Sequence, residues 1–295
     1  MNSLAVVTPS FNQGRYIRAT IESVLSQRAQ NLKYLVVDGG STDGTLDILR
    51  SFGAKLRWIS EPDQGTADAI NKGLNSVGGD ILGWLNSDDI YYRGTLETVQ
   101  DFFEKNPDVD VVYGDAHHID ENGAFIEKYP TEPWSWERFR EICFISQPAA
   151  FFRRRVFQEF GALDTLYPHC VDYELWIRWS KAGAKFEHLP KTLAATRLHS
   201  EAKTVAKRLA CHEDINNILR DHLGKVPQRW VLNYAYAAVD DRGIPRTEQI
   251  RFTGALIKEC VLASARWNRG VDWKMVRTLT GLLRDAVRKG MNEGK

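Results

Sequence analysis

Two adjacent carboxylates stand directly after an apolar run in this chain of 295 residues. Asn86-Ser87-Asp88-Asp89 follows residues 81–85, which are expected to form a buried strand. Neighbouring carboxylates at the end of a buried strand repel each other and are costly to desolvate unless a cation lies between them and a ligand. Mg²⁺ and Mn²⁺ prefer oxygen ligands and keep open positions for phosphate oxygens. The segment therefore predicts either a divalent-metal site or an N-cap of the next helix, where Asp is favoured anyway.

A glycine-rich polar segment, residues 38–44, follows a second apolar run. It is not GxGxxG, so the dinucleotide-binding fingerprint is absent. A carboxylate at a strand's end, here Asp38, can accept hydrogen bonds from ribose hydroxyls or from a base N–H. A tight turn in which Ser41 or Thr42 caps the next helix explains the same residues, and the two interpretations are compatible.

Two acids two positions apart begin an amphipathic segment, residues 172–182. One of Asp172 and Glu174 is expected to face inward, where it could serve as a general base. Favourable placement of acids at the positive end of a helix is the alternative explanation. Arg197 and His199 follow a short apolar stretch further along. His199 is either a metal ligand or a structural histidine.

Strands and helices that alternate over the first 115 residues must position these groups. Short β-branched runs predict strands at residues 4–7, 35–37, 56–59 and 81–85, the first ended by Pro9. Helical spacing predicts helices at residues 16–27, 46–49, 67–74 and 96–103. This alternation predicts an α/β fold with a mostly parallel sheet covered by helices on both faces. The polar clusters at 8–12, 38–44, 61–65 and 86–89 then share the carboxyl edge of the sheet, where ligands bind.

The rest of the chain is less regular. A strand pair is expected at residues 111–117 and 124–127, and helices are expected beyond residue 203, broken near 224–227 and 243–245. Residues 201–295 carry 18 Lys and Arg against 11 Asp and Glu, a net charge of +7. Because the whole chain has a net charge of +1, residues 1–200 carry −6. The sequence predicts an acidic body with a basic tail.

Composition excludes several classes of protein. Apolar residues make up 43% and charged residues 26%, as in an ordinary globular protein, and the balanced charge indicates no nucleic-acid partner. Four scattered cysteines without metal-ligand spacing predict reduced thiols. No apolar run reaches about 18 residues, and the first residues lack a basic leader. We therefore expect a cytoplasmic protein.

Four motifs, in order, resemble those of family 2 glycosyltransferases. They are residues 8–12 (TPSFN), 37–45 (VDGGSTDGT), 86–89 (NSDD) and 172–176 (DYELW). The resemblance covers residues 3–202 and is to the bacterial members that build O-antigen, capsule or exopolysaccharide. It implies a GT-A type, Rossmann-like fold and inverting transfer of a sugar from a UDP-, dTDP- or GDP-sugar. The implied acceptor is a hydroxyl of a glycan or of a polyprenyl-linked glycan.

The resemblance also implies roles for individual residues. Asp172 matches the general base, and Asp88, Asp89 and His199 match the groups that bind Mn²⁺ or Mg²⁺. Lys72 and Arg197 are implied at the diphosphate. The implied nucleotide contacts are Pro9, Ser10, Asn12, Asp38, Gly65, Asp68 and Asp88. The implied acceptor contacts are Gln147, Glu174 and Trp176.

Two residues depart from the family pattern. Asn86 stands where many relatives have another Asp, and Ile70 stands where many have an Arg. Neutralisation of the diphosphate must then rest on the metal, Lys72, Arg197 or His199.

By this resemblance, residues 1–202 form the catalytic domain. Its nucleotide-binding half is 1–115 and its acceptor-binding half is 116–202, and a basic helical region, 203–295, follows. Within that region Trp273, Val276, Leu279, Leu283 and Val287 recur at helical spacing among basic residues. This amphipathic helix is expected either to pack on the body or on a second subunit, which we favour, or to lie on the anionic cytoplasmic face of the inner membrane. The sequence leaves homo-oligomer formation open.

Three rival functions are weaker. A retaining glycosidase needs two carboxylates about 5 Å apart that flank the scissile bond, and no nucleotide pocket. A sugar-1-phosphate nucleotidyltransferase needs a glycine-rich basic loop after the first strand, but residues 8–14 hold one glycine and no lysine. The alternative that stays open is a non-catalytic GT-A scaffold that binds a nucleotide or a partner. The presence of both metal acids and the base disfavours it.

Overall fold

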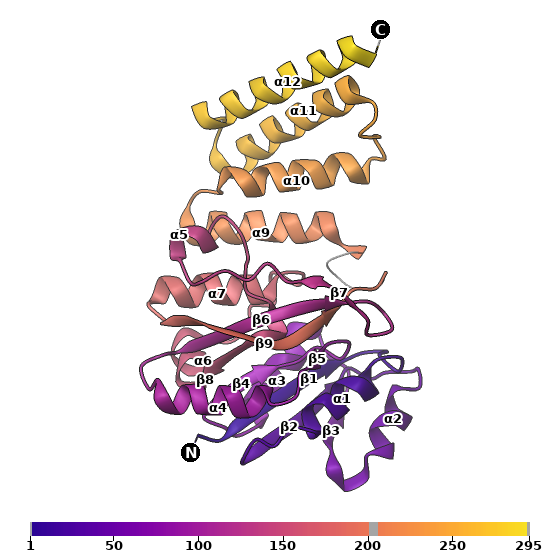
Figure 1. Ribbon diagram of the computed structural model, residues 1–295, viewed down its shortest axis with the longest axis vertical. Coiled ribbons are helices and arrows are strands. Elements are labelled where there is room, and N and C mark those ends of the chain that lie inside the picture. Colours follow the sequence, from indigo (N-terminus) through magenta and orange to yellow (C-terminus); the bar gives the residue numbers. More distant parts are fainter. Residues whose placement is uncertain (1, 201–205, 294–295) are drawn as a thin grey trace. The chain divides into compact units, whose positions relative to one another are not determined.

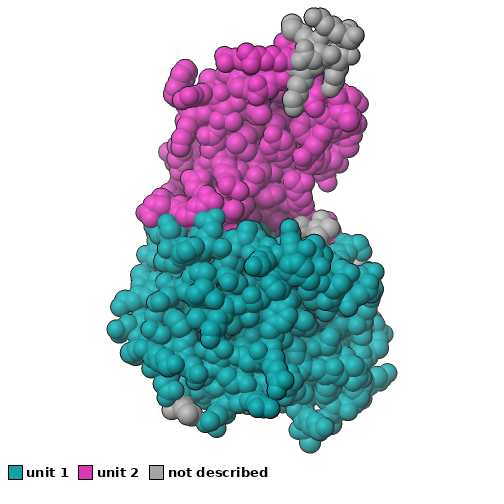
Figure 2. Space-filling model, viewed as in Figure 1, with its two compact units in different colours: residues 1–136, 144–202 teal, residues 137–143, 203–295 magenta. Residues whose placement is uncertain are grey.

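The computed structural model describes residues 2–200 and 206–293, with side chains as far as residue 288. The chain divides into two compact units (Figure 2). Unit 1 comprises residues 1–136 and 144–202, and unit 2 comprises residues 137–143 and 203–295. The domain boundary expected at residues 202 and 203 falls outside the described residues.

A parallel sheet forms the first half of unit 1 (Figure 1). β1 (Leu4–Ser10) lies between β2 (Leu32–Asp38) and β4 (Ile81–Trp84), and β3 (Arg57–Ser60) pairs with β2. The connections hold the helices α1 (Ile17–Leu25), α2 (Thr45–Ser51) and α3 (Thr66–Ser76), with a 3-10 turn at Gly53–Lys55. The predicted α/β fold with a strand–helix alternation is confirmed.

Both faces of this sheet are buried, which is why its strands are continuously apolar. On one face, Leu4 and Val6 join a core with α1 and with α4 (Thr95–Lys105). On the other face, α3 lies so close that a Cβ on Gly73 would come within 2.4 Å of the Val7 side chain. Glycine at position 73 therefore permits this close approach of helix and sheet.

β1 continues through Pro9, where the sequence predicted its end. The carbonyl oxygen of Val7 accepts a hydrogen bond from Leu85 on the β4 side, and that of Ser10 accepts one from Gly39 on the β2 side. Pro9, two residues after Val7, faces the β4 side, where β4 has already ended at Trp84. The missing N–H of Pro9 thus leaves no gap in the ladder.

The second half of unit 1 extends the same sheet with mixed pairing. Its strands are β5 (Ile90–Tyr91), β6 (Val111–Ile119), β7 (Phe125–Lys128), β8 (Ala150–Arg153) and β9 (Phe186–Arg197). β8 runs antiparallel between β4 and β6, β9 runs parallel to β6, and β5 is antiparallel to β9. The expected pair of β6 and β7 is confirmed. β9 escaped prediction because Pro190 and Lys191 interrupt its apolar pattern and its register.

Helices of the second half cover the sheet next to β4. They are α6 (Arg154–Phe160) and α7 (Val171–Ala182), after a 3-10 turn at Gln147–Ala149. Trp176 of α7 stacks on Trp84 of β4, with ring centroids 5.8 Å apart and planes at 20°. This contact anchors α7 near the end of β4.

Unit 2 is helical. It contains α9 (Arg208–Leu223), α10 (Gln228–Asp241), α11 (Gln249–Asn268) and α12 (Trp273–Glu293), and most of α5 (Trp136–Phe139) belongs to it. α10 packs on α9, α11 packs on α10, and α12 packs on α11 (Figure 1). Within the described part of the chain, we find no helix with the length and hydropathy that a membrane span requires.

Candidate active site

The polar loops after β1, β2 and β3 are joined by hydrogen bonds at the carboxyl edge of the sheet. Asn12, with φ at 52°, accepts a bond from the Thr42 N–H at 2.9 Å through its side chain and donates its own N–H to Ser41 Oγ at 2.7 Å. The Gly39 N–H donates to the Ser10 carbonyl at 2.8 Å. The structure therefore brings the loops of Ser10, Asn12 and Asp38 together, with Pro9 buried beneath them.

Asp38 is fully buried and holds these loops in place. Its Oδ1 accepts from Ser41 Oγ at 2.5 Å. Its Oδ2 accepts from Ser60 Oγ at 2.7 Å and from the N–H groups of Ser41 and Gly40 at 2.9 and 3.1 Å. These bonds occupy both carboxylate oxygens, so Asp38 holds the loops together from within. The sequence motifs did not predict that Ser60 binds Asp38, because Ser60 lies one residue before the polar cluster at 61–65.

Gly65, Asp68 and Lys72 lie at the start of α3. Gly65 precedes the helix with φ at 109°, a backbone conformation that favours glycine. Asp68 accepts a bond from the Gln64 N–H at 3.0 Å, and this bond first, then Lys72, lowers the pKa of its carboxyl. Lys72 Nζ lies 3.2 Å from Asp68 and 3.4 Å from Glu61. The side chain of Lys72 is 34% exposed, so its ammonium group lies on these loops and is open to solvent.

Asp88 and His199 form the central pair of the site. His199 Nε2 lies 3.1 Å from Asp88 Oδ2, although 111 residues separate the two along the chain. The His199 side chain is 4% exposed and that of Asp88 is 21% exposed. The pair thus joins the loop after β4 to the segment that follows β9, with one carboxylate edge open to solvent.

Asp89 points into the protein instead. Its Oδ1 accepts a bond from the Arg197 backbone N–H at 2.9 Å, and Asn86 Nδ2 lies 3.4 Å from its Oδ2. Burial, and then the charge of Asp88, raise the pKa of Asp89 well above its usual range. The Asn86 amide also donates to Gln147 Oε1 at 3.1 Å. An amide at position 86 can make both of these donations, which a carboxylate could not.

The Arg197 guanidinium is bound to the protein backbone. It donates to the carbonyls of Asp88 at 2.8 Å, Asp120 at 3.0 Å and Glu121 at 3.3 Å. It also lies 5.1 Å from the Tyr16 ring centroid. In this structure Arg197 ties the loop after β4 to the end of β6, and Lys72 is the more exposed of these two cations.

Tyr16 and Ser10 both carry buried hydroxyls. The sequence predicted Ser10 as a nucleotide contact but did not indicate Tyr16. Among the residues that the structure describes, neither hydroxyl has a hydrogen-bond partner. The Tyr16 ring lies 4.9 Å from the His199 ring between centroids. No spacing in the sequence indicates Tyr16, since it acquires its position only where α1 packs beside the end of β9.

Asp172 stands at the N-terminus of α7 and is half-buried. Burial raises the pKa of its carboxyl, although N–H groups at the start of the helix lower it in part. A carboxylate with a raised pKa is a stronger base than one in water. In the part of the chain that the structure describes, no cationic side chain forms an ion pair with Asp172.

Glu174 and Trp176, two of the predicted acceptor contacts, lie in the core. Glu174 is fully buried and bidentate to Arg178, at 2.8 and 2.9 Å, and Arg178 in turn donates to the carbonyls of Phe160 and Ala162. Trp176 is fully buried against Trp84. The structure does not place these two side chains on an acceptor surface, because α7 turns them toward the body. Gln147 is brought to the site through Asn86 and through the Trp84 carbonyl at 2.9 Å.

A divalent cation is compatible with the Asp88–His199 pair, in which Asp88 is the partly exposed member. Across residues 2–200 and 206–293, no three His, Cys, Asp or Glu side chains gather as a metal cluster. Mg²⁺ and Mn²⁺ at nucleotide sites nevertheless need only one or two protein ligands, because substrate phosphates complete the shell. A carboxylate oxygen and an imidazole nitrogen 3.1 Å apart meet that requirement.

Comparison with known proteins identifies the family. The sequence model described as Glycosyl transferase family 2 matches residues 5–161, more than half of the chain. The chain belongs to glycosyl transferase family 2. It is 27% identical over 227 residues to chondroitin synthase from Escherichia coli, across 76% of this chain and 33% of that protein. It is also 27% identical over 231 residues to an uncharacterized glycosyltransferase from Rickettsia felis, across 73% of this chain and 37% of that protein.

The family members compared are thus longer, and the chain spans about a third of their length. Among solved structures, the chain resembles S. aureus TarS 1–349 in complex with UDP-GlcNAc, with a TM-score of 0.63 and 17% identity, over 99% of this chain and 92% of that chain. It also resembles the mannosyltransferase PcManGT from Pyrobaculum calidifontis in complex with GDP-Man and Mn²⁺, with a TM-score of 0.60 and 16% identity, over 100% and 88% of the two chains. These likenesses confirm the predicted GT-A fold.

Proposed function

We propose that the protein is an inverting glycosyltransferase of surface polysaccharide synthesis. It transfers a sugar from a nucleoside-diphosphate donor to a hydroxyl of a glycan or lipid-linked glycan. Residues 1–202 form its catalytic domain, and it works in the cytoplasm or at the cytoplasmic face of the inner membrane. The observation that carries the proposal is the Asp88–His199 pair at the same sheet edge as the loops of Ser10, Asn12 and Asp38.

The donor's nucleoside lies over the loops after β1 and β2. The buried, unpaired Ser10 hydroxyl gives it a hydrogen-bond partner, and the Asp38 network fixes the shape of these loops. Lys72, beside the loop after β3, contributes a positive charge toward the diphosphate. The solved structures of similar fold contain UDP-GlcNAc and GDP-Man, which supports a nucleotide-sugar donor without choosing between their bases.

Asp88 and His199 hold the divalent metal, while Asp89 fixes the loop from behind. The bound metal supplies positive charge that stabilises the departing diphosphate. Arg197 keeps the Asp88 loop in place through the Asp88 carbonyl, and Tyr16 supports the His199 ring. The complex of PcManGT with Mn²⁺ supports a metal of this kind.

Asp172 is the general base. Its raised pKa lets it remove the proton from the acceptor hydroxyl as that oxygen attacks the anomeric carbon. The attack comes from the face opposite the leaving diphosphate, so the configuration inverts. Of the three predicted acceptor contacts, only Gln147 keeps its role as a residue that contacts the acceptor. The curated relatives include chondroitin and hyaluronan synthases, which supports a polysaccharide acceptor.

The first test is a thermal-shift panel with UDP, dTDP, GDP and CMP, each with and without Mn²⁺. A ligand that binds the folded state raises Tm by mass action. We expect one diphosphate to raise Tm and the shift to depend on Mn²⁺. If no nucleotide shifts Tm at any metal concentration, the donor site is wrong.

The protein offers a matched control for this panel. His188 of β9 pairs with Asp115 of β6 at 2.8 Å, a pair of the same chemistry on two neighbouring strands. His199→Gln is expected to abolish the Mn²⁺-dependent part of the shift, whereas His188→Gln keeps it. If both variants lose it equally, the Asp88–His199 pair is not the metal site.

A further inference from the structure

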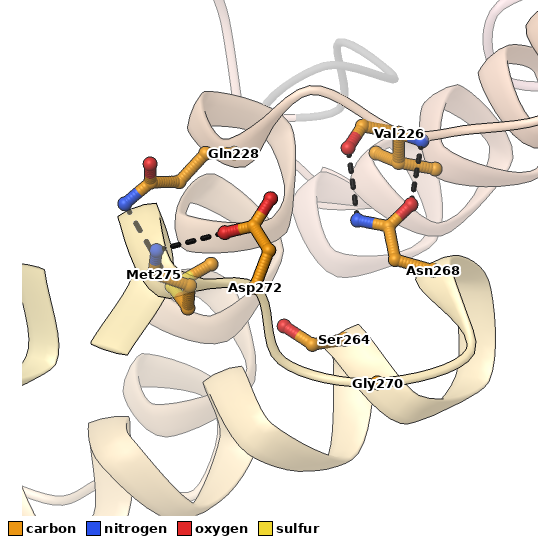
Figure 3. Close-up of a pocket in the computed structure, with 7 residues that line it drawn as sticks. All are labelled: Val226, Gln228, Ser264, Asn268, Gly270, Asp272 and Met275. Carbon is orange, nitrogen blue, oxygen red and sulfur yellow. Dashed lines mark hydrogen bonds between the residues drawn. The ribbon is translucent and has the colours of Figure 1, made fainter. Parts of the chain in front are cut away.

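The last helix presents two apolar faces, and only one of them is covered. Met275, Leu279 and Ala286 are buried, and α12 packs on α11. The start of α12 is fixed by a set of hydrogen bonds (Figure 3). Asp272 accepts from the Met275 N–H at 2.9 Å, and Gln228 donates to Thr278 at 2.6 Å. These contacts set the rotation of the helix.

Asn268 secures the turn before α12. Its side chain donates to the Val226 carbonyl at 2.9 Å and accepts from the Val226 N–H at 2.8 Å (Figure 3). The turn between α11 and α12 is therefore tied to the segment before α10. Because both ends of this connection are held, the outward face of α12 follows from the fold of unit 2.

The outward face carries an exposed apolar stripe. Trp273 is 79% exposed, Val276 39%, Leu283 49% and Val287 40%. Together with Thr280 they recur at intervals of three and four residues, which places them along one side of the helix. Of the apolar residues that the sequence grouped into one stripe, only Leu279 is buried. Packing on α11 thus leaves the other four uncovered.

A band of basic residues runs beside the stripe. Arg277, Arg284 and Arg288 each follow a stripe residue by one position, about 100° further round the helix. All three are exposed, and none forms an ion pair with another residue that the structure describes. Between residues 273 and 288, the sole acid is Asp285. The stripe and its arginine band, which we call the α12 face, consist of Trp273, Val276, Leu283, Val287, Arg277, Arg284 and Arg288.

We propose that the α12 face docks on an anionic lipid surface, with the stripe in the headgroup boundary and the arginines among lipid phosphates. Apolar and cationic residues side by side on one exposed helix face are the pattern of an interfacial helix. Trp is favoured at this depth because its ring is amphipathic, and Trp273 begins the stripe. Arginine side chains beside such a stripe reach outward to phosphates.

Charge also decides against a second copy of the chain as the occupant. In a twofold interface the same patch lies on both subunits, so the arginine bands of two α12 faces would approach each other. Two Asp285 carboxylates, one from each copy, cannot neutralise the six arginines of such a pair. An anionic surface attracts the same arginine band, and added salt weakens this attraction.

The test uses the full chain with vesicles and needs neither donor nor acceptor, so its result is separate from that of the proposed transferase activity. Sedimentation with phosphatidylglycerol–phosphatidylcholine vesicles is compared with phosphatidylcholine alone, at low and high salt. We expect binding to the anionic vesicles at low salt. A triple variant, Arg277→Gln, Arg284→Gln and Arg288→Gln, is expected to bind roughly 100-fold more weakly, from about fivefold for each arginine.

A second variant removes the stripe, and a third serves as control. Trp273→Ser with Leu283→Ser is expected to weaken binding by about tenfold or more, because that apolar area no longer enters the boundary. The control Arg28→Gln, Lys55→Gln and Lys105→Gln removes the same charge from exposed positions of unit 1 and is expected to bind as wild type does. Circular dichroism of each variant verifies folding.

Three outcomes overturn the proposal. The first is no vesicle binding by the wild type at low salt. The second is equal loss in the control variant, which would mean that net charge alone attracts the protein. The third is a dimer in light scattering that the stripe variant abolishes while vesicle binding persists, which would assign the α12 face to a second copy.

Discussion

The sheet edge of unit 1 and the α12 face of unit 2 both gather polar and charged groups, but they differ in what satisfies them. At the edge, Asp38 accepts four hydrogen bonds from its own loops, and Arg197 donates to three backbone carbonyls. On the α12 face, four apolar side chains and three arginines remain exposed within the described chain. The edge is built to be rigid, and the face is left for an external surface.

The difference separates two ways in which a protein prepares for a ligand. A site that stabilises transient charge must have its dipoles fixed before the ligand arrives, since reorganisation would cost energy during the reaction. A docking face needs only a complementary pattern, because the surface it meets is fluid and large. Substitutions at the edge should therefore change function or stability strongly, and those on the α12 face should leave the fold intact.

The largest expected effect is at Asp172. Asp172→Asn should lower kcat by about 10²–10⁴-fold, the usual contribution of a positioned general base. In the wild type, kcat/KM should fall as pH drops through the raised pKa of Asp172, because the protonated carboxyl cannot accept a proton. The pH profile of initial rates measures both. Turnover equal to wild type would favour the non-catalytic scaffold.

The same variant has an opposite effect on stability. The pKa of Asp172 is raised in the folded state, so folding favours its protonated form, and the stability that form contributes at low pH is lost as pH rises through the folded pKa. An amide does not ionise and escapes this loss. Asp172→Asn should therefore raise Tm at neutral pH and have little effect in acid. A lower Tm at neutral pH would assign Asp172 a structural role.

The next largest effect is expected at Glu174. Removal of its charge leaves the half-buried Arg178 without its anionic partner, and breaking a largely buried pair costs up to about 3–5 kcal/mol. Glu174→Gln should lower the free energy of unfolding, measured by urea denaturation, and leave KM for the acceptor unchanged in the folded fraction. A raised acceptor KM with normal stability would restore Glu174 to the acceptor site that the sequence suggested.

Two leucines on α12 test whether the side that packs on α11 stabilises the fold and the α12 face does not. Leu279 is 7% exposed and Leu283 is 49% exposed. Leu279→Ala should cost about 2–5 kcal/mol of unfolding free energy, as for other buried leucines. Leu283→Ala should change it by less than about 0.5 kcal/mol. Similar large costs at both positions would mean that the stripe is covered by the protein itself.

The smallest effect is expected in metal affinity. Asp88→Asn keeps the size of the side chain but removes the charge at the open edge beside His199. We expect at least about tenfold weaker binding of Mn²⁺ in the presence of the nucleotide, measured by calorimetry, because the metal loses a charged ligand. Asp115→Asn is the matched control, with unchanged affinity expected. Equal weakening in both would place the metal elsewhere.

Local patterns determined much of this protein. Short β-branched runs followed by polar turns gave the strands and helices of the first half, and the rule that parallel strands bring their carboxyl ends to one edge placed Ser10, Asp38 and Asp88 on the same side. Periodicity also located α7, with a predicted start at Asp172, one residue after its first residue Val171. These features depend on neighbours within a few residues, so they can be read from sequence.

Tertiary structure alone decided which polar group does what. Asp88 and Asp89 are adjacent in sequence, yet Asp88 contacts His199 and Asp89 is buried against the Arg197 backbone. This difference arises because the end of β9 pairs with β5, which directly follows the two acids. Periodicity likewise marked α12 as amphipathic but could not say which part of its apolar surface α11 would cover. Contacts between residues a hundred positions apart depend on how the whole chain packs, and no local pattern encodes that packing.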